Sequence, residues 1–485
     1  MKLRYRPKTK PFPHQKRATI RAVNRGNYAF FFEPRLGKTK AALDAVAIQA
    51  LRGKCSRVVV LCPRIAIQVW YDQIAEHFPY RAVVKAPGWD RQITLPSQSV
   101  PLVKFFIMNY DKVSQRERIK RKWVHRWGDL ILRFDPDILV LDESHRCKRG
   151  SSNRSRFLWR VVEKMRERRD NNDKRPHVYL LSGTPNPKGY IDLFAQFRIM
   201  DSTIFGTAKA AFEEQYCQYG FGRRRYTIIR YRNKVELLKR IRQNATTVSE
   251  ARAGMIVPKV WQDLTVSLPP QARQKYVEMA EELITEVQNA ESGEMEEITA
   301  VNAAVRRLRL LQITGGFTSS GGQIHDEKLV GLADFLGDLR EQEQSVVIYC
   351  RFVPETIACR RIAARCGFDA ADIRGETTDR DRTAAITRFQ SEANPMALVF
   401  QIQAGAISIE LSAAREVIFY SLPDSWDDYY QALQRVGGPK QNHTIRITHI
   451  VAKNTLDRRV AHALRDKADM HGELLRAPRA FLFGA

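Results

Sequence analysis

Two short segments, each at the end of an apolar run, constrain the fold of this chain more than any other feature. The first is residues 31–39 (FFEPRLGKT), which end the apolar run 28–32 and lead into 40–47, a segment rich in helix-favouring residues. The second is residues 138–145 (ILVLDESH), whose apolar run is typical of a parallel strand buried on both faces. A strand, a loop and a helix, followed by a second buried strand, predict an α/β fold built on a parallel sheet.

The loop at residues 31–39 suits the phosphates of a nucleoside triphosphate. A loop that enters a helix offers free backbone N–H groups and the positive end of the helix dipole. We expect Gly37 to allow close approach of the backbone, Lys38 to reach the outer phosphates and the Thr39 hydroxyl to ligate Mg²⁺. The generic pattern has a glycine where this chain has Phe32, and an ordinary loop is the alternative interpretation.

The two carboxylates that end the second segment complete this chemistry. Asp142 would hold Mg²⁺, directly or through water, and Glu143 would polarise the water that attacks the γ-phosphate. The alternative is a strand followed by an acidic turn, which is common. Because both segments occur in this order, we predict a site for ATP and Mg²⁺ and a nucleoside-triphosphate motor.

These residues resemble helicase superfamily two, and within it the Swi/Snf-like branch of double-stranded-DNA translocases, in the compact type of bacteria and their viruses. The resemblance runs from about residue 10 to about residue 460. The match is specific because its segments occur in the same order along the chain as in the family, although no single segment is specific by itself. The segments that carry it are 13–15 (PHQ), 58–63 (VVVLCP) with Trp70, 107–111 (IMNYD), 142–148 (DESHRCK), 180–185 (LLSGTP), 267–271 (SLPPQ) with Tyr276, 346–352 (VVIYCRF), 403–420 and 431–435 (QALQR).

The resemblance implies roles for residues outside the two segments. Gln15 would read the adenine, and Arg435 of the second lobe would contact ATP and take part in catalysis together with Lys38 and Glu143. Ser182 and Thr184 would couple the ATP site to DNA. The residues expected to contact DNA phosphates, each with an ordinary surface position as the equal alternative, are Arg64, Asn109, Lys148, Arg149 and Arg351.

Two positions depart from the family pattern. The last motif of the family carries two arginines, and Arg435 fits the first, but Gly438 occupies the second position. The missing arginine predicts slow hydrolysis unless Lys440 or another basic residue substitutes. Glu410 stands where asparagine is usual, so the loop that contains it is expected to grip DNA differently.

The net charge of +27 predicts a polyanionic partner. Basic residues cluster at 116–122, 146–156, 223–225 and 306–309. A solvated basic surface and adhesion to acidic membranes are the alternatives. The helicase-like motifs favour nucleic acid, and double-stranded DNA above all.

Composition also argues against several classes of protein. There is no apolar run long enough for a membrane span and no stretch typical of a signal peptide. The seven cysteines are scattered and odd in number, which predicts a reduced protein without a metal finger. We therefore expect a cytoplasmic protein, and the resemblance implies that its setting is a bacterial cell or a virus-infected host.

The expected fold class is α/β, with two tandem RecA-like parallel-sheet lobes and helical and basic insertions between them. The predicted regions are lobe one at 1–205, an inter-lobe insertion or protrusion at 206–325, lobe two at 326–460 and a C-terminal helix and tail at 461–485.

Two finer expectations concern strands. The alternating basic and β-prone residues 223–232 predict a short hairpin, which either touches DNA or is an exposed edge protected by charge. In lobe two, strands are expected near 346–350, 371–374, 397–401, 416–420 and 445–451.

The leading hypothesis is a DNA-dependent ATPase that translocates on double-stranded DNA and could also unwind or branch-migrate it. A nucleotide-responsive DNA-binding subunit with weak or no hydrolysis is the alternative, which Gly438 supports and the intact Lys38, Asp142 and Glu143 oppose. An RNA-directed ATPase is a third hypothesis, which the Swi/Snf-like middle region and the basic residues after Glu143 disfavour.

Overall fold

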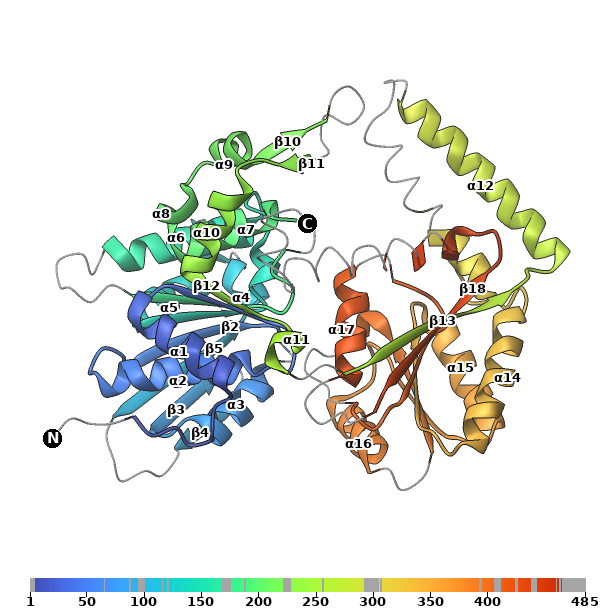
Figure 1. Ribbon diagram of the computed structural model, residues 1–485, viewed down its shortest axis with the longest axis horizontal. Helices are drawn as coiled ribbons and strands as arrows, with labels where there is room; N and C mark the ends of the chain where they lie inside the picture. Colours follow the sequence, from blue (N-terminus) through green and yellow to red (C-terminus); the bar gives the residue numbers. More distant parts are fainter. Residues whose placement is uncertain are drawn as a thin grey trace. The chain divides into compact units, whose positions relative to one another are not determined.

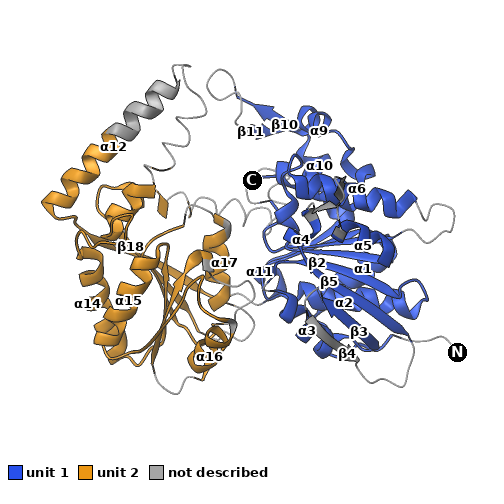
Figure 2. Ribbon diagram, turned by 180° about the vertical axis from the view of Figure 1, so that it is seen from behind, with its two compact units in different colours: residues 1–254, 473–485 blue, residues 255–472 orange. Residues whose placement is uncertain are grey.

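The computed structural model divides into two compact units, which lie within residues 1–254 and 255–472 (Figure 2). We call them unit 1 and unit 2. The residues that the structure describes are 5–64, 66–86, 89–94, 101–115, 117–119, 122–124, 126–167, 176–186, 189–220, 228–254, 257–291, 305, 308–391, 395–404, 411–423, 426–437, 443–458, 460–461 and 464.

Unit 1 is built on an eight-stranded sheet in the order β12-β1-β9-β8-β2-β5-β3-β4 (Figure 1). Neighbouring strands are parallel except β3 and β4, which are antiparallel. The strands are β1 (Tyr28–Phe32), β2 (Arg57–Cys62), β3 (Arg81–Ala86), β4 (Trp89–Thr94), β5 (Leu102–Asn109), β8 (Ile138–Asp142), β9 (His177–Leu181) and β12 (Ala245–Val248).

Helices cover both faces of this sheet. One face carries α1 (Pro13–Arg25), α2 (Lys38–Leu51) and α3 (Ala66–His77), and the other carries α5 (Arg126–Phe134), α6 (Asn153–Glu167), α7 (Ile191–Met200) and α10 (Lys234–Asn244) (Figure 1). Every residue of β1 and β8 is buried. The continuous apolar runs of the sequence are therefore explained by helices on both sides of the strands.

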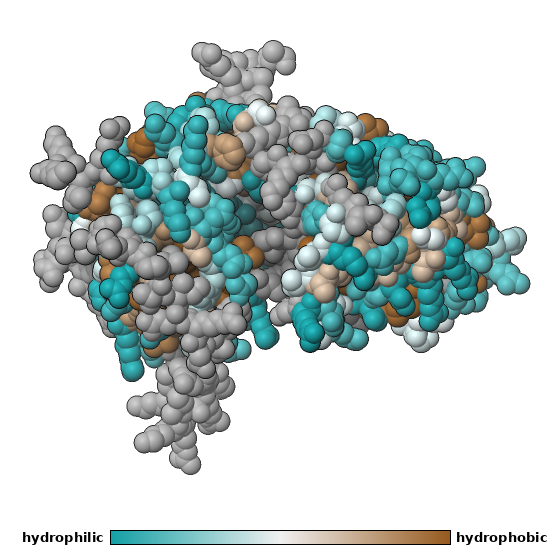
Figure 3. Space-filling model, turned by 90° about the horizontal axis from the view of Figure 1, so that it is seen from below, coloured by the Kyte–Doolittle hydropathy of each residue, from teal (hydrophilic) through white to brown (hydrophobic). Residues whose placement is uncertain are grey.

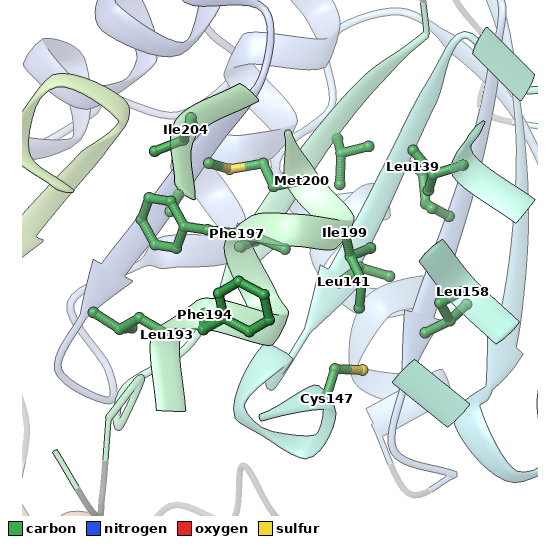
Figure 4. Packing of buried hydrophobic residues seen from close by; sticks show 14 of the residues in the cluster. Leu139, Leu141, Cys147, Leu158, Leu193, Phe194, Phe197, Ile199, Met200 and Ile204 are labelled. Carbon is green, nitrogen blue, oxygen red and sulfur yellow. The ribbon is translucent and has the colours of Figure 1, made fainter. Parts of the chain in front are cut away.

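The core on the second face joins β8 to α6 and α7. Leu139 and Leu141 of β8, Leu158 of α6, and Phe194 and Phe197 of α7 belong to one buried hydrophobic cluster (Figure 4). All five side chains are at most 1% exposed. This packing fixes the end of β8, where Asp142 lies, relative to the segment that follows β9.

Shorter elements complete unit 1. Two antiparallel hairpins occur, one from β6 (Glu117–Ile119) and β7 (Lys122–Val124), the other from β10 (Cys217–Tyr219) and β11 (Ile228–Tyr231). The hairpin expected at 223–232 thus begins earlier, and its basic run 223–225 lies outside the described residues. The remaining helices are α4 (Tyr110–Ser114), η1 (Ser144–Cys147), α8 (Ser202–Phe205), α9 (Lys209–Tyr216) and α11 (Glu250–Ala253).

Unit 2 is built on a six-stranded, fully parallel sheet in the order β13-β18-β17-β14-β16-β15. Its strands are β13 (Lys259–Val266), β14 (Val346–Cys350), β15 (Asp369–Ile373), β16 (Met396–Gln401), β17 (Glu416–Phe419) and β18 (Ile445–Ala452). The five strands expected in this region are confirmed. Its helices are α12 (Pro270–Glu291), α14 (Glu327–Glu341), α15 (Val353–Arg365), α16 (Asp379–Gln390), η3 (Ile402–Ala404) and α17 (Trp426–Val436).

Two separate cores lie on the two faces of the second sheet. One packs α14 and α15 against the strands, and the other packs α16 and α17. The segment 206–325, expected between the lobes, contributes β12 to the first sheet and β13 to the second. The expected α/β fold with two RecA-like parallel-sheet lobes is confirmed.

The visible surface in Figure 3 is dominated by hydrophilic residues (teal), with hydrophobic ones in small scattered patches. Among the described helices, none combines the length and the apolar character that a bilayer crossing needs.

Candidate ATP site and nucleic-acid interface

The loop between β1 and α2 is shaped by a glycine that cannot be replaced without strain. Gly37 has φ 74°, a left-handed conformation that a side chain disfavours. A Cβ at this position would lie 2.0 Å from Nε2 of Gln15. Nε2 of Gln15 donates a hydrogen bond to the Leu36 carbonyl at 3.1 Å. Gln15 is therefore held directly against the loop that precedes α2.

Phe32 occupies the position of the missing glycine because the chain is still a strand there. Phe32 pairs with Val248 of β12 and is fully buried. The turn begins only after it, where Oε2 of Glu33 accepts a hydrogen bond from the Glu250 N–H at 2.6 Å. A glycine is not needed at a position that keeps extended, paired backbone.

Lys38 and the two carboxylates come together at the carboxyl ends of β1 and β8. Nζ of Lys38 lies 3.1 Å from Oε1 of Glu143. Oδ2 of Asp142 accepts a hydrogen bond from Nε1 of Trp70 at 2.9 Å. The Tyr110 hydroxyl donates to the backbone carbonyl of Asp142 at 2.7 Å. The structure thus assembles the lysine and both carboxylates predicted from the sequence in one buried cluster.

Burial and charge set the ionisation of this cluster. Burial raises the pKa of Asp142 to about 6, against the opposing charge of Lys38. Burial also disfavours ionised Glu143, but Lys38 and His145 outweigh it, so the pKa of Glu143 lies well below its usual range. For Lys38, Glu143 and then Asp142 outweigh the burial that disfavours the charged form, and its pKa is raised. The Lys38–Glu143 pair is therefore charged at neutral pH.

A chain of contacts leads from Glu143 to the segment after β9. Nδ1 of His145 lies 3.3 Å from Oε2 of Glu143 and 3.1 Å from Oγ of Ser182. Oγ of Ser182 accepts a hydrogen bond from the Thr184 N–H at 3.2 Å. His145 thus connects the carboxylate to both residues expected to couple ATP to DNA.

These residues fit a nucleotide with Mg²⁺. A loop in which only glycine fits, a lysine and a helix that begins at Lys38 form a cradle for phosphates. Thr39, in the first turn of α2, follows Lys38 directly. Within the described residues no cluster of three or more His, Cys, Asp or Glu side chains could hold a metal alone. Proteins bind Mg²⁺ through one or two carboxylates plus phosphate oxygens, and Asp142 could supply such a carboxylate.

Four expected DNA contacts lie at the same edge of the unit 1 sheet. Arg64 is exposed and follows β2, and Arg149 is exposed and follows η1. Lys148, next to Arg149, is half-buried. Asn109 ends β5, where its Oδ1 accepts a hydrogen bond from the Lys112 N–H at 2.9 Å and caps α4. The Asn109 carbonyl oxygen is therefore engaged in helix capping.

The expected residues of unit 2 occupy two different settings. Arg351 follows β14, and its N–H donates to Oγ of Ser421 at 2.7 Å. Its side chain lines a pocket of about 300 Å³ together with Gln401 and Gln403. Arg435 of α17 is 6% exposed, and its guanidinium lies 5.9 Å from the ring centre of Tyr349. Residues 405–410 and 438–440, with Glu410, Gly438 and Lys440, lie outside the described residues.

Three residues of the site were not given roles from the sequence. Trp70 and Tyr110 support Asp142, and His145 joins Glu143 to Ser182. All three lie within or beside segments that carry the resemblance, which was the available signal. Their partners are distant in sequence, so no local pattern reveals the contacts.

A parallel-sheet unit with a glycine-dependent loop at one strand end and a lysine–carboxylate cluster at another defines a RecA-like nucleotide-binding lobe, and a second parallel α/β unit follows it. The family model for the SNF2-related domain matches residues 23–312, and that for the helicase conserved C-terminal domain matches residues 327–439. The chain belongs to the SNF2-related family, and the two matches together identify a helicase-type enzyme.

Several relatives align along most of the chain. The SWI/SNF-related matrix-associated actin-dependent regulator of chromatin subfamily A-like protein 1 homolog of Caenorhabditis elegans is 23% identical over 96% of this chain and 61% of that protein. The DNA annealing helicase and endonuclease ZRANB3 of Mus musculus is 22% identical over 96% of this chain and 41% of that protein. This chain therefore spans less than two thirds of the length of both relatives.

Two further matches are a phage protein that this chain covers almost completely and a solved structure. The putative protein p41 of Acyrthosiphon pisum secondary endosymbiont phage 1 is 24% identical over 91% of this chain and 93% of that protein. Among solved structures, the Sulfolobus solfataricus SWI2/SNF2 ATPase core in complex with dsDNA is 16% identical, with a TM-score of 0.43 and coverage of 99% of this chain and 96% of that chain.

Proposed function

We propose that this protein is a DNA-dependent ATPase that couples ATP hydrolysis to translocation on double-stranded DNA, with unwinding or branch migration as further outcomes. The observation that carries the proposal is the Lys38–Glu143 pair, 3.1 Å apart, in which Glu143 is buried and Lys38 is half-buried, beside the buried Asp142. Two neighbouring carboxylates buried with one half-buried cation are costly to the fold. Such a cluster is typical of a site whose chemistry requires it.

The proposed roles follow from the geometry. Bound ATP with Mg²⁺ would supply the phosphoryl group to be transferred. Lys38 would exchange its contact with Glu143 for the outer phosphates, and Thr39 and Asp142 would ligate the Mg²⁺. Glu143, freed from Lys38 and still in contact with His145, would orient and deprotonate the attacking water.

His145 gives the proposed coupling a physical route. When Lys38 leaves Glu143, the remaining contact of that carboxylate is with His145, which also contacts Ser182. Oγ1 of Thr184 is buried without a hydrogen-bond partner in the described part of the chain. A segment with an unsatisfied buried hydroxyl gains by changing partners. We propose that nucleotide binding shifts the 182–184 segment in this way.

DNA is the proposed partner because cations gather at the carboxyl ends of the unit 1 strands, beside Lys38 and Asp142. We call this side of the sheet the nucleotide edge. Arg64, Lys148 and Arg149 all follow strands whose carboxyl ends form that edge. The net charge of +27 favours a polyanion. One relative is named a DNA annealing helicase, and by analogy we extend DNA binding to this chain. Contacts to phosphates rather than bases would allow movement along any sequence.

Further proposals concern unit 2 and the setting of the protein. We propose that Gln15 contacts the adenine, that Arg435 contacts ATP and that Arg351 contacts DNA. We keep the proposed domain boundaries at residues 205, 325 and 460. A reducing, cytoplasmic setting is supported by the seven cysteines, none of which forms a disulfide in the described part of the chain and six of which are buried.

The alternative is a nucleotide-responsive DNA-binding subunit with little hydrolysis. Gly438, in place of an arginine, supports it. An arginine finger supplies several orders of magnitude in rate in enzymes that have one, so its loss predicts slow turnover. The intact Lys38, Asp142 and Glu143 cluster argues for the ATPase.

The test is the steady-state ATPase rate with duplex DNA, single strands, RNA or no nucleic acid. Duplex DNA should stimulate the rate most, and Lys38→Ala should lower it by a factor of about 10² or more, since one phosphate-stabilising group is lost. Lys54→Ala, an exposed lysine beyond α2, is the matched control. Gly438→Arg should raise the rate if the finger is missing.

The outcomes separate the hypotheses. Negligible turnover in every variant, with duplex binding intact, would overturn the ATPase and leave the binding subunit. Stimulation by RNA above that by duplex DNA would overturn the choice of DNA. An ATPase rate that Lys38→Ala leaves unchanged would refute the assignment of the ATP site to these residues.

A further inference from the structure

A basic groove lies at the β12 edge of the unit 1 sheet, where helices from the two faces meet. It is about 510 Å³ in volume and is lined by α1 and α10. Its cationic lining residues are Arg21, Arg25, Lys239 and Arg242, and none of the described lining residues is acidic. We call it the edge groove.

The edge groove is distinct from the nucleotide edge. Arg21, Arg25 and Arg242 lie in the carboxyl-terminal parts of α1 and α10, the helices that lead into the amino ends of β1 and β12 (Figure 1). Val235 lies in the first turn of α10. Lys38 and Asp142, in contrast, lie at the carboxyl ends of β1 and β8. In a parallel sheet these are opposite edges.

Arg21 has a structural role in the groove in addition to its positive charge. Its guanidinium donates to Oγ1 of Thr246 at 3.4 Å and to the carbonyl of Arg242, and it lies 5.7 Å from the ring centre of Tyr28. Arg21 therefore ties α1 to the end of α10 across β12. The remaining three cations form no ion pair within the described residues, so their charges face the groove unopposed.

The basic surface extends beyond the groove along α1. That helix contains no Asp or Glu, and Lys16 and Arg17 are exposed on it like Arg21 and Arg25. Arg17, Arg21 and Arg25 follow one another at four-residue spacing along one face of α1, a row of about 12 Å at the rise of an α-helix. A row of this length matches several phosphates of a nucleic-acid backbone better than a single small anion.

Like charges crowd the α10 side of the groove. Burial and the nearby Arg252 both lower the pKa of Arg242, because each disfavours its positive charge. Uncompensated repulsion of this kind costs stability in the free protein and is relieved when a polyanion binds.

We propose that the edge groove binds the phosphate backbone of a second duplex DNA segment, so that one chain can hold two duplexes. Arginine side chains match phosphate oxygens geometrically. Among the described residues that line the groove, four are cations and one, Val235, is hydrophobic. The proposal rests on the proposed function only for the choice of DNA as the polyanion.

The test uses the full chain with two exposed cations reversed, Arg25→Glu with Lys239→Glu. Arg21 is kept because it holds the helices together. The matched control reverses two exposed cations on β3, Arg81→Glu with Lys85→Glu, which lie toward the other end of the sheet. Both variants change the net charge equally.

Two readouts are needed. The first is binding of one labelled 30-base-pair duplex as a function of salt, together with ATPase stimulation by that duplex. The second is capture of a labelled duplex by protein already saturated with an immobilised one. The groove variant should lose capture by about tenfold or more at moderate salt, since each lost phosphate contact removes counterion release. Its single-duplex affinity and ATPase stimulation should stay within about threefold of the control.

Three results would overturn the proposal. Capture that is equal in the groove and control variants would show that the edge groove does not bind DNA. Competition by poly-glutamate, but not by duplex DNA, would make the partner an acidic peptide. In the third result, wild-type protein binds one duplex and shows ATPase stimulation but fails to capture a second duplex. That result would refute only the proposed role of the edge groove. Loss of all DNA binding would refute the proposed function as well.

Discussion

At the scale of single residues, Gly37 shows how one backbone conformation shapes the nucleotide loop. Its φ of 74° and the 2.0 Å approach of Gln15 to a Cβ are independent constraints. Gly53 has a φ of 70° and no neighbour within 4 Å of a Cβ. The two glycines therefore separate the cost of backbone strain from the cost of a clash.

We predict that Gly53→Ala lowers stability by about 1 kcal/mol, the cost of a left-handed φ for a residue with a side chain. Gly37→Ala should cost more and should also weaken binding of a fluorescent ATP analogue by about tenfold, because Gln15 must move. Thermal unfolding and fluorescence titration check both. Equal analogue affinity in the two variants would contradict the role given to the loop.

At the same scale, Glu355 predicts a pH dependence of unit 2. Its Oε2 accepts hydrogen bonds from the Phe352 N–H at 3.1 Å and from the Ser421 hydroxyl at 2.5 Å. Burial raises its pKa from 4.5 to about 7. Because the folded state holds the proton more tightly than the unfolded state, stability is highest below pH 4.5 for this group and falls as pH rises toward 7.

The expected loss between those pH values is at most about 3 kcal/mol from this group. Hydrogen exchange of the β14 and β17 amides, measured from pH 5 to 8 and corrected for intrinsic rates, reports it in the full chain. Glu355→Gln keeps the acceptor oxygen and cannot ionise, so it should flatten the profile. A profile that is the same in both proteins would refute the assignment.

At the scale of elements, β8 and β9 pair along the backbone up to Asp142 and Leu181, and the segments beyond these residues are joined by a side chain. His145 of η1 lies between Glu143 and Ser182. We predict that His145→Ala leaves analogue binding within about twofold but lowers the duplex-stimulated ATPase rate by about tenfold, the usual scale for a lost orienting contact.

Ser144→Ala is the control for this prediction. It removes a neighbouring hydrogen bond, from the Ser144 hydroxyl to Oε1 of Gln196 at 2.8 Å, without touching Glu143. Stimulation reduced equally in both variants would mean that the whole of η1, and not the His145 contact, carries the effect.

The same elements show what the sequence could and could not predict. β14, β16 and β17 are buried runs, and local pattern located them well. β13 was missed because most of its residues are exposed, so its sequence lacks a buried run. Trp70 pairs with Asp142 across 72 positions, a contact that only the folded sheet creates. Burial along the chain was predictable, and contacts between distant segments were not.

At the scale of the whole molecule, each unit has its own sheet and its own hydrophobic core. We therefore expect calorimetry to resolve two unfolding transitions. A ligand raises the transition of the unit that binds it, by about 2.7 kcal/mol of stability at a hundred times its Kd. An ATP analogue with Mg²⁺ should raise the unit 1 transition, and Lys38→Ala should abolish that shift.

The proposed contact of Arg435 with ATP also predicts a ligand effect on the unfolding of unit 2. If Arg435 contributes to binding, the analogue should raise the unit 2 transition as well, and Arg435→Met should remove that second shift while the first remains. Methionine preserves the length of a side chain that lies over Tyr349 and Phe400, and comparing each variant with and without analogue cancels its own stability change. Arg361→Ala, exposed on α15, is the control. If the analogue leaves the unfolding temperature of unit 2 unchanged in wild-type protein, Arg435 is excluded from the site. That result would also strengthen the case for a binding subunit with slow turnover.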